Sequence, residues 1–549
     1  MRKLLLFFFK YTKLYFIIIS SCVPTRWYSH VCSFSHPIEK LSCYLLLCTK
    51  YLKNYEVLFE KVEELEMSSG CCNIVRNLFR RRSGDGEAEP LITTPRSQAS
   101  QLPQFIAALA ATLGGFVMGS QLGWTSPTKA EMVAKYSMSD LDWSWVSGIL
   151  PAGAMVGALA AGSICDQIGR RMTIIVTVIP STVGWAMILW APGTWMVILG
   201  RAVLGSVSGV LSCACPLYTN EIAETAIRGT LGTFFQLQVT LGILFSYIVG
   251  ALIKVTPFSI VCVVIPFVPS IIMFFMPESP TYYLKKGNNI AAKNALQRLR
   301  GGRYNVDNEI ATTQKILEEV EAQKMSFAQA FSTTAAKNGL TIGLAVMFFQ
   351  QFSGINGVIF HASSIFKDAG TSVDGNTAAI VTGIFSVVGT LISTQIIDRL
   401  GRKPLLFTSD VFMAASAALL GIFFFLKDGK YELAEDTIVK TVPLIAVCVF
   451  IFMFAIGYGP IPWMFIAEIF PPAIKGPASS IACFFNWICA FSVSFGFPLM
   501  NSSLGGAWTF FIFSVGSKLG ESRASRIYLA LSCVCVRRMG CERDCESVF

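Results

Sequence analysis

The sequence predicts an all-α membrane protein whose helices form two similar bundles. Of its 549 residues, 53% are hydrophobic and 14% are charged, whereas soluble proteins carry about 25% charged residues. Eleven apolar stretches reach the length of about 20 residues that a helix needs to cross a bilayer. A polar motif, Asp-x-x-Gly-Arg-Arg/Lys, occurs once in each half of the chain. Such a repeat indicates a duplicated membrane bundle, which is typical of transporters.

The predicted membrane-spanning helices fall into two groups of six. Apolar runs locate eleven of them, and a twelfth begins near Ala507. Charged residues soon follow Ala507, so this last helix is predicted to be truncated or altered. The eleven spans are 103–125, 143–164, 172–191, 196–218, 229–253, 258–276, 338–361, 377–397, 404–426, 442–466 and 477–500.

These spans divide the chain into five parts. The central polar part has charged, amphipathic stretches, which predict short helices between the bundles. The broken apolar runs of residues 1–66 are interpreted as an artefact of the gene model, with a signal peptide as the alternative. The parts are an amino-terminal tail at 1–102, a first bundle at 103–276, a linker at 277–337, a second bundle at 338–516 and an atypical tail at 517–549.

Lysine and arginine gather before the first span and in every second loop. By the positive-inside rule, this predicts a cytosolic amino terminus and a cytosolic linker. The same distribution accounts for the net charge of +10 without a nucleic-acid partner. We expect a multi-pass protein of the plasma membrane that functions as a monomer in the lipid bilayer. The acidic dileucine pattern at 87–92 raises the hypothesis of endosomal cycling.

Two further segments repeat a carboxylate followed by a cation, Glu221–Arg228 and Glu468–Lys475. Their cations are predicted to lie on the same side of the membrane as those of the loop motifs Asp166–Arg171 and Asp398–Lys403. An unpaired charge at membrane depth costs several kcal/mol, so these charges are expected to form ion pairs. The alternative for the loop motifs is that their cations only set the topology. Because each segment has a counterpart in the other half, we favour one ion-pair network per half.

These segments and several other motifs resemble those of sugar porters of the major facilitator superfamily. Residues 347–370 are most similar to the insect facilitated trehalose transporters, with the glucose facilitators next. The resemblance covers residues 103–510 and implies the major facilitator fold and a sugar substrate. Catalytic residues, metal ligands and cofactor motifs are absent from the sequence, so an enzyme is not expected. The other motifs are Gly200-Arg201, Pro277–Pro280, Gln350–Asn356 and Gly459–Trp463.

Amide and indole side chains within the spans are the predicted sugar contacts. A sugar hydroxyl both donates and accepts hydrogen bonds, and an uncharged amide does the same. For an isolated amide, hydrogen bonding between helices is the alternative. The resemblance implies that this set binds the sugar, with tryptophan lying against the ring. The set is Gln236, Gln350, Gln351, Asn356, Trp463 and Asn486.

The resemblance also implies that charged residues at the cytosolic end form a gate. Phe360-His361 replaces the paired tyrosines that glucose facilitators carry after span seven's asparagine, which alters the predicted outer gate. The predicted gating residues are Asp166, Arg170, Arg171, Arg201, Glu221 and Arg228 in the first half, and Asp398, Arg402, Lys403, Glu468 and Lys475 in the second.

Span one contains no carboxylate, and Gln121 stands where proton-coupled sugar porters carry an aspartate. A proton relay needs an ionisable group in the cavity. We therefore predict facilitated diffusion of trehalose, or of a hexose such as glucose, by alternating access. The alternatives are a proton-coupled sugar symporter and a sugar sensor that does not transport.

Overall fold

The computed structural model consists almost entirely of α-helices, and no strand occurs in the residues that it describes. The all-α prediction is confirmed. Side chains are described over slightly narrower ranges than the backbone, and those of Asp398, Glu468 and Lys475 fall outside them. The described backbone covers residues 99–302, 304–322, 334–371, 373–428, 437–470 and 475–538.

The first six spans are built from eight helices, because two spans are broken in the middle, and a ninth helix, α5, lies between the first two spans. One break lies at Thr177 and the other at Ile265-Pro266, where proline removes a backbone donor. The helices are α4 (Leu102–Gly123), α5 (Thr125–Tyr136), α6 (Asp140–Ile168), α7 (Arg170–Val176), α8 (Val178–Leu189), α9 (Thr194–Ile222), α10 (Arg228–Leu252), α11 (Val255–Val264) and α12 (Phe267–Phe274).

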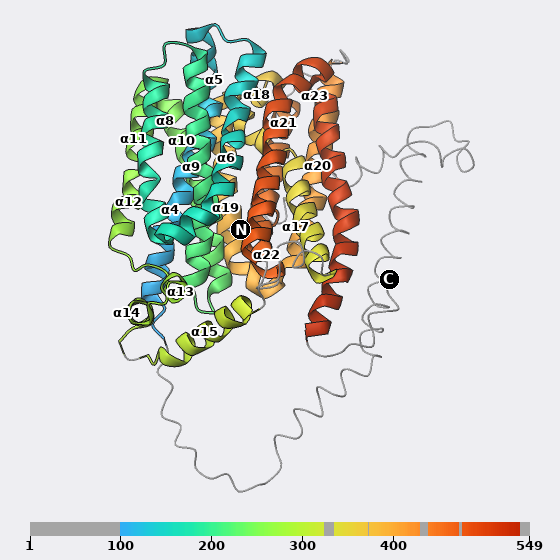
Figure 1. The fold of residues 1–549 in the computed structure, drawn as a ribbon. Coiled ribbons are helices and arrows are strands. Elements are labelled where there is room, and N and C mark those ends of the chain that lie inside the picture. Colours follow the sequence, from blue (N-terminus) through green and yellow to red (C-terminus); the bar gives the residue numbers. More distant parts are fainter. Residues whose placement is uncertain are drawn as a thin grey trace, which may run out of the picture. The chain divides into compact units, whose positions relative to one another are not determined.

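In the part of the linker that the structure describes, three short helices precede the second group of spans (Figure 1). They are α13 (Pro280–Lys285), α14 (Asn289–Arg300) and α15 (Asp307–Ala322), where the amphipathic pattern predicts short helices. The later helices are α17 (Thr334–Phe352), α18 (Ile355–Ala369), α19 (Gly375–Leu400), α20 (Arg402–Asp428), α21 (Thr437–Ile456), α22 (Ile461–Ile469) and α23 (Lys475–Arg538).

Eleven helical stretches of the described residues are long and apolar enough to cross a membrane, whereas the sequence predicts twelve spans. The last of them contains two arms of α23, which meet at Gly505 with φ of 82°. The rings of Phe497 and Phe513 stack across this turn at 6.2 Å. The second arm starts where the twelfth span is predicted, and its backbone stays helical to Arg538. The predicted truncation therefore applies to the length of the apolar stretch, while the helix that contains it continues further.

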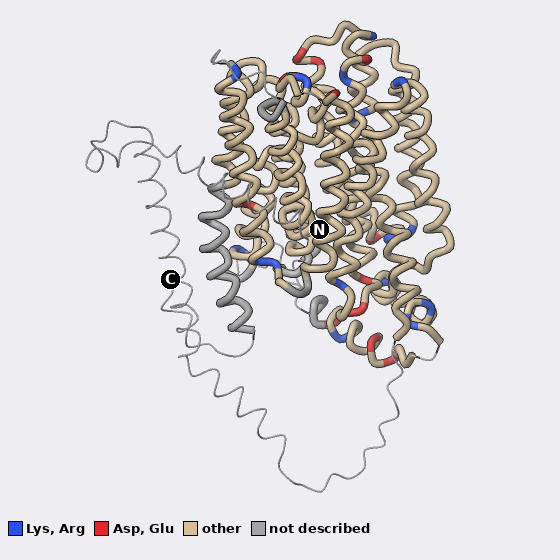
Figure 2. Tube along the Cα trace, turned by 180° about the vertical axis from the view of Figure 1, so that it is seen from behind, with Lys and Arg blue, Asp and Glu red and all other residues tan. Residues whose placement is uncertain are grey.

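The two bundles meet along two helix pairs, α6 with α23 and α10 with α19. Small residues allow such close approach: a Cβ at Gly148 of α6 would lie 2.8 Å from the Phe495 side chain of α23. Charged residues gather mostly near the helix ends, and long uncharged stretches lie between them (Figure 2). This distribution is the one that a lipid bilayer requires.

Candidate functional site

An open cavity lies between the two bundles. Along α10 it extends from Gln236 to Tyr247, about 16 Å at 1.5 Å per residue. All six predicted sugar contacts line it: Gln236 from α10, Gln350 and Gln351 from α17, Asn356 from α18, Trp463 from α22 and Asn486 from α23.

Four of the amides are joined in one chain of hydrogen bonds. Nδ2 of Asn356 donates to Oε1 of Gln351 at 2.6 Å, and Nε2 of Gln351 donates to Oδ1 of Asn486 at 3.0 Å. Nδ2 of Asn486 donates to Oε1 of Gln350 at 2.8 Å, and Nε2 of Gln350 donates to the Tyr458 carbonyl at 2.6 Å. Gln350 Nε2 also donates to the Gly459 carbonyl at 3.3 Å, and Asn486 Nδ2 donates to Met347 Sδ at 3.0 Å. Each amide is thereby held in one orientation.

Both ends of this amide chain lie at breaks in membrane-spanning helices. α17 and α18 are separated at Gly354, where φ is 89° and an added Cβ would meet the Phe513 ring at 2.6 Å. α21 ends before Gly457, and Pro460 and Pro462 cannot supply the donors that would continue the helix. The Tyr458 carbonyl lies at this break and accepts from Gln350. The amides thus connect the two breaks.

The remaining predicted contacts face this amide chain from other elements. Gln236 is the one predicted contact from the first bundle, and its Nε2 lies close to Gly459. Trp487 follows Asn486 into the cavity lining and donates from Nε1 to Ser212 Oγ at 3.4 Å, across the two bundles.

Several hydroxyl residues of the cavity lining were missed by sequence reasoning, among them Thr240, Thr382 and Ser386. Hydroxyl side chains in membrane helices commonly bond to their own backbone, as Thr382 does to the Ala379 carbonyl at 2.8 Å. Nothing in the sequence therefore separated these hydroxyls from structural ones.

One end of the cavity is closed by α18. The Tyr247 hydroxyl of α10 donates to the Ile359 carbonyl at 2.7 Å. Ser363 joins α18 to Ser126 of α5 twice, with its Oγ donating to the Ser126 carbonyl at 2.8 Å and its backbone N to Ser126 Oγ at 3.1 Å. Because Ser126 lies two residues after Trp124, we call this the Trp124 end and the opposite end the Glu221 end.

The altered position Phe360-His361 lies in the same closing helix. The His361 ring is buried and stacks on Phe497 at 5.1 Å between centroids. Its backbone leaves the helical region, with φ of −122° and ψ of 17°, which kinks α18. His361 thus packs within the second bundle.

At the Glu221 end, Arg170 is the centre of an ion-pair network. Its guanidinium is 1% exposed and contacts Glu221 at 3.0 Å and Asp166 at 3.2 Å. Lys285 of α13 contacts Asp166 at 3.3 Å. Ser279 Oγ donates to the other oxygen of Glu221. Among the described side chains, these contacts hold α6, α7, α9 and α13 together within the first half, and they do not bridge the bundles.

Glu278 also belongs to this network. It is part of the motif Pro277–Pro280, but that motif alone does not indicate its role. Its Oε1 accepts from the backbone N of Arg170 and of Arg171, each at 3.1 Å. The start of α7 favours a carboxylate there because its first N–H groups lack helical partners. Gly169 allows this approach, since its φ is 93° and a Cβ would lie 2.4 Å from Glu278 Oε2.

Two of the predicted gating residues have different contacts. Arg201 lies about 30 Å along α9 from Glu221, at the Trp124 end, so its assignment to the same ion-pair gate is wrong. The reason is visible in the predicted span 196–218, because residue 201 stands near its start and Glu221 follows its end. Arg228 donates to the Ala223 carbonyl at 3.3 Å, while Glu221 pairs with Arg170.

Most of the predicted gating residues of the second half have side chains that the structure does not describe. Asp398, Glu468 and Lys475 lie outside the residues whose side chains are described. Arg402 and Lys403 begin α20. The predicted network of the second half therefore stays a prediction.

Residues 104–517 match the family model of the sugar (and other) transporters. The chain belongs to this family. A facilitated trehalose transporter of Culex quinquefasciatus is 36% identical over 464 residues, which are 81% of this chain and 89% of that protein. The facilitated trehalose transporter of Aedes aegypti is 36% identical over 415 residues, but this chain spans only 51% of its length.

Solved structures of the xylose transporter XylE from E. coli share the fold. A partially occluded inward-open form has a TM-score of 0.65 at 21% identity, covering 76% of this chain and 96% of that chain. The major facilitator proton:xylose symporter XylE bound to 6-bromo-6-deoxy-D-glucose has a TM-score of 0.66 at 22% identity, covering 76% and 94%. The major facilitator fold of this sugar transporter-family chain is thereby confirmed.

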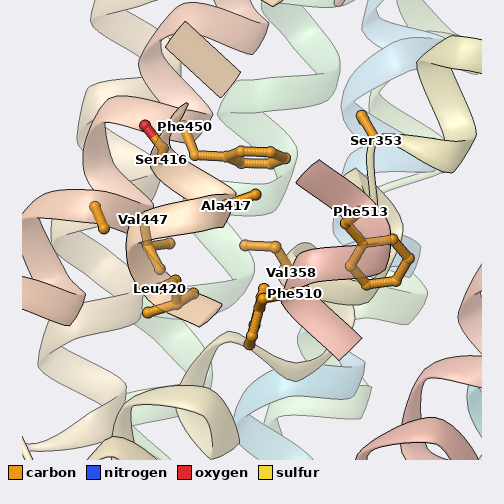
Figure 3. A pocket seen from close by; sticks show the side chains of 10 residues that line it. Ser353, Val358, Ser416, Ala417, Leu420, Val447, Phe450, Phe510 and Phe513 are labelled. Carbon is orange, nitrogen blue, oxygen red and sulfur yellow. The ribbon is translucent and has the colours of Figure 1, made fainter. Parts of the chain in front are cut away.

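A second, smaller pocket lies behind the break between α17 and α18 (Figure 3). Ser353 and Val358 line it beside the break, facing Ala417, Phe450 and side chains of α23. Its lining contains neither an amide nor a charged group. Its hydrogen-bonding side chains are the hydroxyls of Ser353 and Ser416, so it is a poorer match for a sugar than the cavity with the amides.

Proposed function

We propose that this chain carries trehalose or a hexose across the plasma membrane by facilitated diffusion. One observation supports this most: six residues chosen from the sequence as sugar contacts line a single cavity between the bundles. Neutral amides and a tryptophan suit a polyhydroxylated, uncharged ligand. The relatives named facilitated trehalose transporters favour the same substrate class.

The proposed cycle is alternating access around this cavity. Lysine and arginine favour the Glu221 end as the cytosolic end, with the amino terminus and the linker on that side. The closed Trp124 end then faces outward. Opening requires α18 to leave Ser126 and Tyr247, while the sugar leaves through the Glu221 end after that end opens. Residues 103–276 and 338–516 are proposed as the two moving bundles, with 277–337 between them.

The surroundings of Arg201 support uniport over proton-coupled transport. This buried guanidinium donates to the Gln121 carbonyl at 2.6 Å and to Thr125 Oγ1 at 2.9 Å, and it lies 5.4 Å from the Trp124 ring. Oε1 of Gln121 accepts from Ser208 Oγ at 2.5 Å. All these partners are uncharged, and α4, which is described throughout, contains no Asp or Glu. Nothing in this contact set exchanges a proton.

Uptake of radiolabelled trehalose and glucose into proteoliposomes that contain the full chain tests the proposal. We expect saturable uptake that stops when the inside and outside concentrations are equal. A proton gradient should change neither the rate nor the end point. Absence of uptake of both sugars by correctly inserted protein would refute sugar transport, and accumulation driven by the proton gradient would refute uniport.

A further inference from the structure

Two arginines from different helices contact the backbone just after the sixth membrane-spanning stretch. Arg171 of α7 donates from Nη1 to the Met276 carbonyl at 3.0 Å. Arg298 of α14 donates from Nη2 to the Phe275 carbonyl at 2.6 Å. The two acceptors are consecutive in the chain, so the two guanidiniums are anchored one residue apart. Both stand beyond the carboxyl end of α12, where the helix dipole favours cations.

The positive charges of these two arginines are not neutralised within the described part of the chain. Among the described side chains, no carboxylate forms an ion pair with either guanidinium. Arg298 is exposed and Arg171 is half-buried. A guanidinium has five N–H donors, and the backbone contacts use one on each side chain. Several neighbouring cations do pair with carboxylates, namely Arg170, Lys285, Lys293 and Arg300.

Exposed aromatic rings adjoin the same two guanidiniums. Phe274 and Phe275 are 66% and 61% exposed, and their rings lie 5.8 Å apart at 87° to each other. The sixth membrane-spanning stretch ends at Phe274, so these rings stand at the level where the acyl chains of a bilayer meet the headgroups. Two unpaired cations beside an apolar surface at this level suit a ligand with an anionic head and an apolar tail.

We propose that these two arginines bind the headgroup of an anionic glycerophospholipid such as phosphatidylserine, whose acyl chains lie against Phe274 and Phe275. Guanidiniums bind phosphate oxygens through paired N–H groups. The carboxylate of phosphatidylserine adds a second acceptor, whereas the choline of phosphatidylcholine would bring a further positive charge. The site lies at the Glu221 end, and with the orientation proposed above it faces the leaflet in which anionic lipids occur.

Binding of the lipid is measured directly by native mass spectrometry of the full chain in a neutral detergent. The chain is titrated with phosphatidylserine or with phosphatidylcholine of the same acyl composition. We expect the parent to bind phosphatidylserine at least about fivefold more tightly, since each cation at a membrane surface contributes about this factor. Equal affinity for the two lipids would overturn the proposal. The measurement needs neither sugar nor orientation in a membrane, so it stays decisive if the transport proposal fails.

Substitutions then locate the site. Arg298→Gln should weaken phosphatidylserine binding about fivefold and leave phosphatidylcholine binding unchanged. Lys293→Gln is the matched control, because it removes an exposed cation of the same helix that already pairs with Asp307 at 2.6 Å. This control should bind like the parent. Equal losses in these two variants, or no loss in Arg298→Gln, would overturn the site. Arg171→Gln tests the second contact independently and should show the same loss.

A soluble headgroup separates a lipid site from a site for a free anion. Glycerophosphoserine carries the same charged groups without the acyl chains. It should not displace phosphatidylserine at equal concentration, because nothing in it packs against the exposed phenylalanines. Displacement as effective as that by the intact lipid would overturn the assignment of a lipid.

Discussion

Asn486 is the position at which one substitution tests the amide chain most sharply. It donates to Gln350 and accepts from Gln351, at 2.8 and 3.0 Å. Asn486→Leu keeps the side-chain size and removes both bonds. Hydrogen bonds between membrane helices contribute about 0.6 kcal/mol each on average. The fold should lose about 1 kcal/mol, which is small against a stability of roughly 5–15 kcal/mol, so the variant should still fold.

The expected effect on transport is larger. The variant loses the proposed contact between Asn486 and the sugar and the restraint on two further amides. At about 0.5–1.5 kcal/mol for each of three hydrogen bonds, the loss is roughly 1.5–4.5 kcal/mol. Since about 1.4 kcal/mol corresponds to a factor of ten, kcat/KM for uptake should fall by about ten- to a thousandfold.

The assay is initial-rate uptake, normalised to the amount of protein in the membrane. Asn289→Leu is the matched control, because Asn289 accepts from Gln314 at 2.9 Å on the exposed helices α14 and α15. It should transport like the parent. Parental uptake by Asn486→Leu at normal membrane levels would show that the amide chain does not bind the sugar.

Three further predictions concern the backbone, the closed end and ion coupling. Gly169→Ala should lower thermal stability in detergent by at least about 1–2 kcal/mol, since an L-residue is strained at positive φ, whereas Gly302→Ala, with open space around it, should not. Ser363→Ala removes one hydrogen bond, worth about 0.5–1.5 kcal/mol, that closes the Trp124 end. A cysteine placed in the cavity should then react up to tenfold faster with an impermeant maleimide added from outside. An unchanged labelling rate would contradict the assigned closure. Gln121→Glu places an ionisable group beside Arg201, so uptake should become dependent on external pH, and a flat pH profile would argue against this account of coupling.

Some of the site was predictable from residue chemistry. Amides inside apolar spans are unusual because unsatisfied polar groups are costly in a membrane, which marked Gln350 and Asn486 without a structure. The helix breaks were also visible, since Pro460 and Pro462 cannot continue a helical ladder. The eleven spans followed from length and hydrophobicity alone.

Other features depended on contacts between distant segments. Arg201 and Glu221 belong to the same helix, yet helix length separates them and only the fold shows that their environments differ. The role of Glu278 requires α7 to begin against the loop after α12, which no local pattern specifies. The contact between Ser126 and Ser363 could not be predicted, because it depends on the packing of α5 against α18.

Sugar uptake into proteoliposomes with and without an imposed proton gradient tests the central claim most directly. The cavity amides and the uncharged contacts of Arg201 predict saturable uptake that reaches equal concentrations on both sides, with the same rate and end point under both conditions. Sugar accumulation above the external concentration under the proton gradient, abolished by a protonophore, would contradict it.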